Sequence, residues 1–101
     1  MEQIQRIMLM EEIFQQTQQT LTALADSLAA YRNMQAAMRQ LFDYYGSNEW
    51  KQDFAADEQG KLPPTMKRGV LSEDGVWHIL QEHKDLLQEM KEILNHNFQA
   101  A

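Results

Sequence analysis

The chain has 101 residues and a net charge of −6, and its four glycines, two prolines and thirteen glutamines favour helix over sheet. This length allows one small domain and excludes a large enzyme core. The absence of cysteine excludes disulfide bonds, thiol catalysis and cysteine-ligated zinc or iron–sulfur sites. We find no signal peptide and no apolar run near the roughly 18 residues of a membrane span, so we expect a soluble cytoplasmic protein.

Charge is unevenly distributed along the chain. Residues 1–45 carry a net charge of −2, residues 46–72 are neutral, and residues 73–101 carry −4. The strongest basic cluster is only Lys67-Arg68. Nucleic acids and anionic membrane surfaces are both bound through clustered Lys and Arg side chains. We therefore expect neither a nucleic acid nor a membrane as a partner.

Residues 1–45 contain no glycine or proline, and apolar residues recur every three or four positions. This pattern predicts one long amphipathic helix that ends before Gly46. Written as heptads, position a holds Ile7, Phe14, Leu21, Leu28, Gln35 and Phe42, and position d holds Met10, Thr17, Leu24, Tyr31, Met38 and Tyr45. A third apolar position holds Ile13, Met34 and Leu41, which favours more than one neighbouring helix. A break near Asp26-Ser27 remains an alternative to a continuous helix.

Residues 46–72 predict a short helix and an ordered loop. Ser47 is the expected N-cap, Glu49 lies in the first turn, and an amphipathic helix over 48–59 ends at Gly60. Pro63 and Pro64 then exclude ordinary helix over residues 61–69.

Residues 73–98 predict a second long helix. Ser72 is the expected N-cap, with Glu73 and Asp74 in the first turn and a hydrophobic staple between Leu71 and Val76. Apolar residues then recur at steps of four and three to about Phe98. The fold class expected for residues 1–101 is therefore a single all-α domain: a long antiparallel helical hairpin, coiled-coil-like, with a short connecting helix and an ordered loop.

The two long helices differ in expected length. At 1.5 Å per residue they span about 65 Å and about 39 Å, which leaves roughly 25 Å of apolar stripe without an intramolecular partner. This part contains Ile4, Ile7, Met10, Ile13 and Phe14. A long exposed apolar patch is unusual on a monomer, so we expect a homodimer through the N-terminal part of the first helix.

Candidate interaction or ligand residues gather in and beside the segment that joins the helices. They are Tyr44, Tyr45, Trp50, Asp53, Asp57, Lys67, Arg68, Trp77 and His83. The acidic row at positions 49, 53 and 57 has two interpretations: it pairs with the cations at 61, 67 and 68 to fix the loop, which we favour, or it forms a recognition surface. His83 occupies a core-type position, where it is a neutral histidine bonded to Tyr31 or Tyr45, a boundary residue, or a pH-responsive or ligand-contacting group.

Metal binding and catalysis find little support in the sequence. Glu92 and His96 share a helical spacing, but a di-iron bundle needs Glu-x-x-His pairs, and no glutamate stands three residues before any histidine. The acids of residues 82–92 lie opposite the leucine stripe, as on a solvated face. We expect no cofactor, no metal site and no enzymatic activity.

One run of residues is similar to a known family. The run comprises Tyr44-Tyr45-Gly46-Ser47, Glu49-Trp50, Asp53, Asp57-Glu58, Gly60, Leu62-Pro63 and the block 67–74, Lys-Arg-Gly-Val-Leu-Ser-Glu-Asp. It resembles the bacterial family catalogued as domain of unknown function 4298, and the resemblance covers nearly the whole chain. It implies a small cytoplasmic bacterial protein and no particular activity, ligand or partner.

Two functions follow from these features. We favour a non-catalytic module for protein–protein interaction or self-association, with an unidentified protein partner. The alternative is a small-ligand or metal-binding regulatory domain whose pocket forms where Tyr44, Tyr45, Trp50, Phe54 and Trp77 converge.

Overall fold

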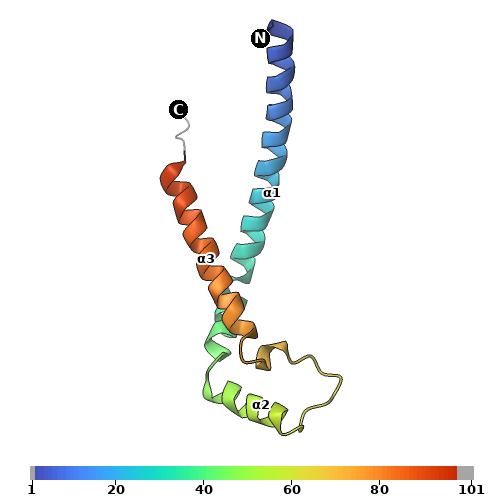
Figure 1. Cartoon of the computed structure of the whole chain (residues 1–101), viewed down its shortest axis with the longest axis vertical. Coiled ribbons are helices and arrows are strands. Elements are labelled where there is room, and N and C mark those ends of the chain that lie inside the picture. The colour runs from blue at the N-terminus through green and yellow to red at the C-terminus, as the bar shows by residue number, and fades with distance from the viewer. Residues whose placement is uncertain (1, 98–101) are drawn as a thin grey trace. The chain divides into compact units, whose positions relative to one another are not determined.

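A computed structural model describes residues 2–97. It contains the α-helices α1 (Gln3–Tyr44), α2 (Asn48–Glu58) and α3 (Gly75–His96), and a 3₁₀ turn η1 (Gly69–Leu71) before α3 (Figure 1). None of residues 2–97 forms a strand. The all-α class with three helices is thus confirmed, whereas the expected last helical residue, Phe98, lies outside the described residues.

The chain divides into two compact units, Met1–Met38 and Arg39–Ala101. The described part of the first unit is almost wholly α1. The second unit contains the last turns of α1 together with α2, η1 and α3. No helix within residues 2–97 combines the length and the apolar character needed to cross a lipid bilayer.

Helix α1 is continuous through Asp26-Ser27, so the alternative of a break there is wrong. Its 42 residues correspond to about 63 Å, and the 22 residues of α3 to about 33 Å. A helix as short as α3 covers about half of α1 at most. No residue of α1 between Gln3 and Tyr44 is buried.

The turn between α1 and α2 has the expected local chemistry. Gly46 adopts φ +79°, a left-handed conformation that other residues rarely take, and the Ser47 amide donates to the Tyr44 carbonyl at 3.0 Å. The Ser47 hydroxyl then accepts from the Trp50 amide at 3.1 Å and caps α2. The predicted N-cap is confirmed.

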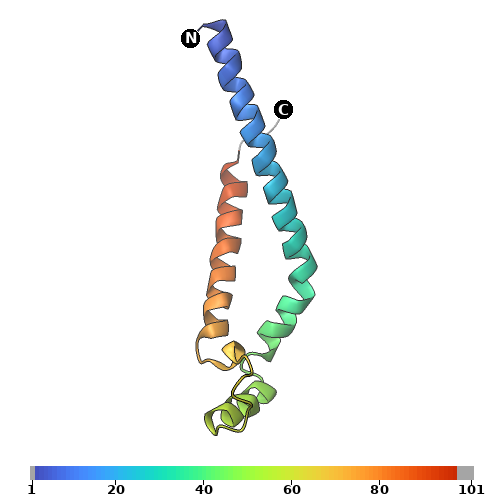
Figure 2. The same ribbon diagram turned by 90° about the vertical axis from the view of Figure 1, so that its right-hand side faces the viewer.

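The end of α2 is closed by Gly60, which has φ +69°. The Gly60 amide donates to the Asp57 carbonyl and the Lys61 amide to the Ala56 carbonyl, both at 3.0 Å, which is the Schellman pattern of helix ends. A second turn follows at once, where the Met66 amide donates to the Pro63 carbonyl at 3.1 Å. The loop then passes back to η1 (Figure 2).

The start of α3 differs from the sequence prediction. Asp74 has φ −120° and ψ −5°, so α3 begins at Gly75 and not at residue 73. The Ser72 hydroxyl accepts from the Gly75 amide at 3.0 Å and also donates to the Gly69 carbonyl at 2.8 Å. Ser72 therefore joins η1 to α3 with one side chain, and Glu73 and Asp74 precede the helix.

The second unit is organised around η1, which packs against both α2 and α3. Leu71 of η1 and Val76 of α3 are 4% and 2% exposed, and they are the buried residues of the described range. These are the two residues that the sequence assigned to a hydrophobic staple. The last turns of α1 also meet the beginning of α3: the rings of Phe42 and His83 lie 5.7 Å apart.

Substituting Gly60 tests the helix end. Neither Gly60 nor Gly69 has any atom within 4 Å of an added Cβ, so the two differ in backbone conformation and not in space. We expect Gly60→Ala to lower the free energy of unfolding by about 1 kcal/mol, because alanine disfavours positive φ. Urea denaturation measures this, with Gly69→Ala as the matched control that changes little. Equal effects of the two substitutions would contradict the explanation.

Candidate functional site

Three ring-bearing residues at the junction of α1 and α2 form the aromatic cluster: Tyr45, Trp50 and Phe54. The Tyr45 and Trp50 rings meet edge to face at 5.2 Å, and the Trp50 and Phe54 rings stack at 5.1 Å with 20° between their planes. Such ring pairs contribute about 0.5–1.5 kcal/mol beyond the area that they bury. The structure thus brings together most of the residues expected at the proposed pocket.

The polar atoms of Trp50 and Tyr45 bind the main chain of the segment that leads into α3. The Trp50 indole Nε1–H donates to the Val70 carbonyl at 2.8 Å, and the Tyr45 hydroxyl donates to the Glu73 carbonyl at 2.8 Å. The Trp50–Val70 bond joins residues that are 20 positions apart in the sequence, and the Tyr45–Glu73 bond joins residues that are 28 positions apart. The cluster therefore fixes the path of the loop, and its hydrogen-bonding groups are used within the chain.

Tyr44 and Asp53 form a strong hydrogen bond between α1 and α2. The Tyr44 hydroxyl donates to Asp53 Oδ2 at 2.5 Å. This bond raises the pKa of Tyr44 to about 12; desolvation and the negative charges of Asp53 and Glu49 act in the same direction. The carboxylate stabilises the neutral phenol, so Tyr44 is a hydrogen-bond donor and not a proton-releasing group near neutral pH.

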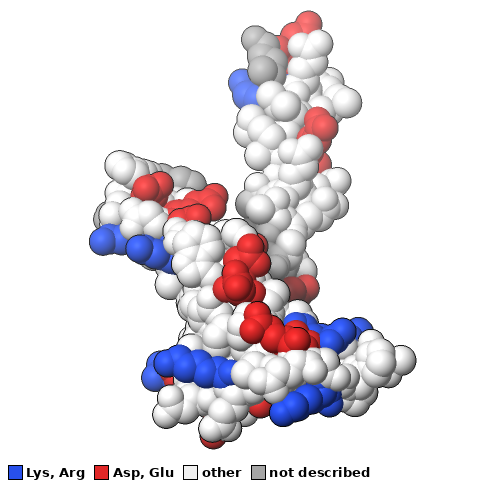
Figure 3. Space-filling view, turned by 60° about the horizontal axis from the view of Figure 1, so that its bottom comes forward, with Lys and Arg blue, Asp and Glu red and all other residues white. Residues whose placement is uncertain are grey.

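The acidic row is tied to the loop at one point. Arg68 Nη1 lies 2.6 Å from Asp57 Oδ1, so the loop folds back onto α2, as the favoured interpretation of these charges predicted. Glu49, Lys61 and Lys67 are exposed. In the face shown in Figure 3, basic and acidic side chains are interspersed around this end of the chain. Of the described charges in this region, Arg68 and Asp57 form an ion pair that holds the loop against α2, and the exposed ones form a surface of mixed sign.

Trp77 and His83 both lie on α3. Trp77 is 51% exposed, and its ring packs edge to face against His78, whose Nε2 lies 3.5 Å from Asp74 Oδ2. His83 is half-buried on α3 beside Phe42. The hydroxyl of Tyr45, one of the partners expected for His83, donates to the Glu73 main-chain carbonyl.

The residues with metal-ligand spacing form no visible metal centre. Within residues 2–97, no group of three or more His, Asp or Glu side chains lies close enough to hold a metal ion. Glu92 accepts a hydrogen bond from Gln88 at 3.3 Å, and Asp85 accepts one from Gln81 at 3.2 Å. These are exposed contacts one turn apart on α3.

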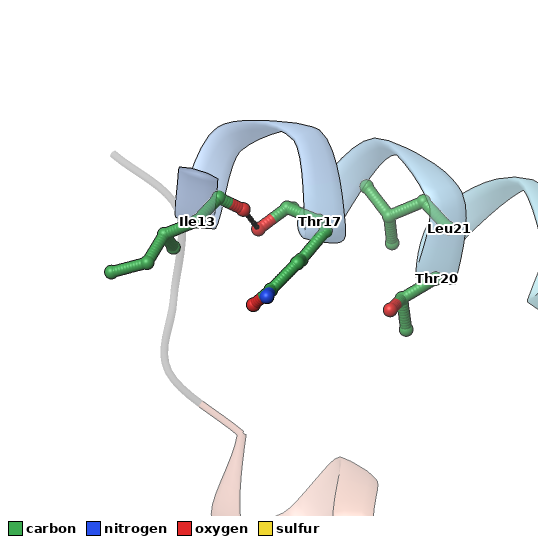
Figure 4. A pocket seen from close by; sticks show the side chains of 5 residues that line it. Ile13, Thr17, Thr20 and Leu21 are labelled. Carbon is green, nitrogen blue, oxygen red and sulfur yellow. Dashed lines mark hydrogen bonds between the residues drawn. The ribbon is translucent and has the colours of Figure 1, made fainter. Parts of the chain in front are cut away.

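A shallow depression on α1 is a feature that the sequence did not single out. It has a volume of about 290 Å³ and is lined by Ile13, Gln16, Thr17, Thr20 and Leu21. Figure 4 shows the labelled side chains along one side of the helix. The Thr17 hydroxyl donates to the Ile13 carbonyl at 2.7 Å, so its polar atom is satisfied by its own helix. The sequence signal is a pair of small threonines between larger apolar residues.

Comparison with known proteins identifies the family. A family model described as Domain of unknown function (DUF4298) matches residues 7–93. The chain belongs to this family. The DUF4298 match includes all of α2 and η1 and most of α1 and α3, which confirms the resemblance seen in the sequence. Searches of curated proteins and of solved structures returned no match.

The two tryptophans of this DUF4298 chain provide a matched test of the aromatic cluster. Trp50→Phe keeps a stacking ring but removes the donor to the Val70 carbonyl, so we expect a loss of about 1 kcal/mol in the free energy of unfolding. Trp77→Phe, at an exposed site, should change it much less. Urea unfolding of both variants makes the comparison, and an equal or larger loss for Trp77→Phe would contradict the assigned role of Trp50.

The Tyr44–Asp53 bond predicts a loss of stability at high pH. An unfolded chain releases the tyrosine proton near its ordinary pKa of 10.0, whereas the folded chain keeps it to about 12. The stabilisation is therefore complete below the lower value and declines as pH rises to the upper one. Urea unfolding across this range should show a smaller decline for Tyr44→Phe.

Asp53→Asn provides the control for this pH effect. It removes the carboxylate that stabilises the neutral phenol, so the pKa of Tyr44 should fall toward its ordinary value, as measured by phenolate absorbance. A wild-type titration in which all three tyrosines ionise together at the ordinary value would contradict the assignment.

Proposed function

We propose that the chain is a non-catalytic helical interaction module that self-associates through the N-terminal part of α1. The observation that carries this proposal is a row of open heptad positions, the N-terminal seam: Ile7, Met10, Phe14, Thr17, Leu21, Leu24 and Leu28. The six apolar members each expose between 45% and 58% of their surface. Their spacing is that of helices that pack against other helices in a coiled coil.

A long helix of this kind depends on packing. Helices in proteins gain most of their stability from burying an apolar face, and each square ångström of apolar surface removed from water contributes about 25 cal/mol. Among the other described elements, α2 has 11 residues and α3 has 22, whereas α1 has 42. The difference in length supports a partner for the N-terminal part of α1.

One turn near the start of α1, residues 7–10, is apolar on every side. Ile7, Met8, Leu9 and Met10 are consecutive, so their side chains point in four directions about 100° apart, and all four are exposed. A helix that is apolar all round is normally buried on all sides. This supports burial of this turn against a second copy of the chain.

The depression beside the N-terminal seam supports close packing. A side chain from a second helix fills such a hollow in knobs-into-holes contacts. Thr17 borders the depression, and its hydroxyl is satisfied by the Ile13 carbonyl, so burying Thr17 leaves no unpaired polar atom there.

The connector of residues 46–72 supports a structural role over the alternative of a ligand or metal site. Trp50 and Tyr45 donate to main-chain carbonyls, Tyr44 binds Asp53, and Arg68 binds Asp57. Groups engaged with one another are poorly placed to receive a ligand or to transfer protons. We propose that the connector orients the helices and that binding occurs along α1. A cysteine-free sequence suits the reducing bacterial cytoplasm, which we propose as the compartment.

Charged substitutions on two sides of α1 test the proposal. Light scattering on the wild-type protein at tens of micromolar should give the mass of a dimer. Phe14→Glu places a carboxylate in the N-terminal seam, and we expect a monomer, because an unpaired charge resists burial. Gln19→Glu adds the same charge on the outer face and should leave the dimer intact.

Circular dichroism of both variants separates lost association from lost helix. We expect Gln19→Glu to keep the wild-type helical content. In Phe14→Glu, we expect any loss of helical content to accompany dissociation of the dimer. A wild-type monomer, or a Phe14→Glu variant that stays dimeric, would refute self-association through this seam.

A further inference from the structure

We infer that two copies of the chain meet along the N-terminal seam as parallel helices in register. This inference rests on the proposed self-association and adds its geometry. It follows from the charges beside the seam, at heptad positions e and g. Over residues 4–28, position e holds Ile4, Glu11, Gln18 and Ala25, and position g holds Arg6, Ile13, Thr20 and Ser27.

Arg6 and Glu11 are the only charged residues at these flanking positions. They have opposite charges, both are exposed on α1, and they stand five residues apart. Neighbours on one helix surface are three or four residues apart, so a separation of five does not bring the two side chains together within one copy. Their charges are therefore available to a second helix.

Parallel pairing places these charges in contact. In a parallel coiled coil, position g of one helix lies beside position e of the following heptad in the other. Arg6 of each copy then faces Glu11 of the second copy, and the two-fold symmetry makes two such pairs. A shift by one heptad would place Arg6 beside Ile4 or Gln18 instead, so the pairs also specify the register.

Antiparallel pairing gives no such complementarity. There, position g faces g and position e faces e, so Arg6 meets either a neutral side chain or another arginine. The remaining charges between residues 7 and 28, Glu12 and Asp26, occupy the outer position f. Charge complementarity in the seam region is therefore present in one orientation.

The layers of the seam also match in parallel register. Each residue faces its own counterpart, so Phe14 meets Phe14 and Leu21 meets Leu21. The central layer is Thr17, whose hydroxyl donates within its own helix and needs no partner across the interface. The larger residues on either side stay paired with residues of equal size.

Single cysteines test the orientation, because the chain has none of its own. Met10→Cys and Leu24→Cys lie in the seam two heptads apart. In the parallel, in-register dimer each variant faces itself, so both should form covalent dimers on mild oxidation. Gln19→Cys, on the outer face, is the control that should crosslink much less.

An antiparallel dimer would give a different result. In one antiparallel register, two residues face each other only if their numbers have a fixed sum, so positions 10 and 24 do not both pair with themselves. An antiparallel coiled coil pairs position a with position d, so a dimer in the register that places Phe14 opposite Thr17 would join Met10→Cys to Leu21→Cys in a mixture of those two variants. Crosslinks in that mixture without self-crosslinks would overturn the parallel orientation while leaving self-association intact.

Charge reversal provides the second readout. Arg6→Glu and Glu11→Arg each replace two attractive pairs with two repulsive ones, and we expect each to weaken the dimer about tenfold. Mixing the two variants should restore association, because the heterodimer regains both attractions. Absence of this rescue would overturn the inferred pairing. A wild-type monomer in light scattering would instead refute the proposed function itself.

Discussion

The length of α1 is the constraint on which the rest of the structure depends. Its 42 residues carry the apolar heptad pattern to within a few residues of its beginning, whereas α3 has 22 residues. A helix with an apolar face gains most of its stability from packing that face against other groups. Residues 39–97 thus make contacts around η1, whereas the apolar residues of the N-terminal seam are exposed, which is why we propose a second copy as their partner.

The connector is held mainly by side chains that donate hydrogen bonds to main-chain carbonyls, and less by pairs of side chains. Trp50 and Tyr45 each pack a ring against the other and donate a hydrogen bond to a main-chain carbonyl in or near η1. Each residue therefore both stabilises the connector and fixes the path of its main chain. The Asp57–Arg68 pair closes the same loop from its other side. The DUF4298 match spans the residues of this connector together with most of α1.

Much of the fold was predictable because its signals are local. Gly46, Ser47 and Gly60 act through their own backbone or cap geometry, and Asp57 pairs with Arg68 because a short proline loop limits how far the cation can move. The turn η1 was missed, since three residues show no periodicity. The exposure of Trp77 was also missed: successive helical residues point about 100° apart, so the neighbour of buried Val76 faces elsewhere.

In the dimer that we propose, the small number of buried residues would link folding to protein concentration. With Leu71 and Val76 alone fully buried among residues 2–97, a single copy removes little apolar surface from water. Stability gained through a second copy follows mass action, so it grows with the amount of protein present. In the dimer that we propose, the exposed seam on α1 would make the folded population sensitive to expression level, and dilution would weaken the helix as well as the complex.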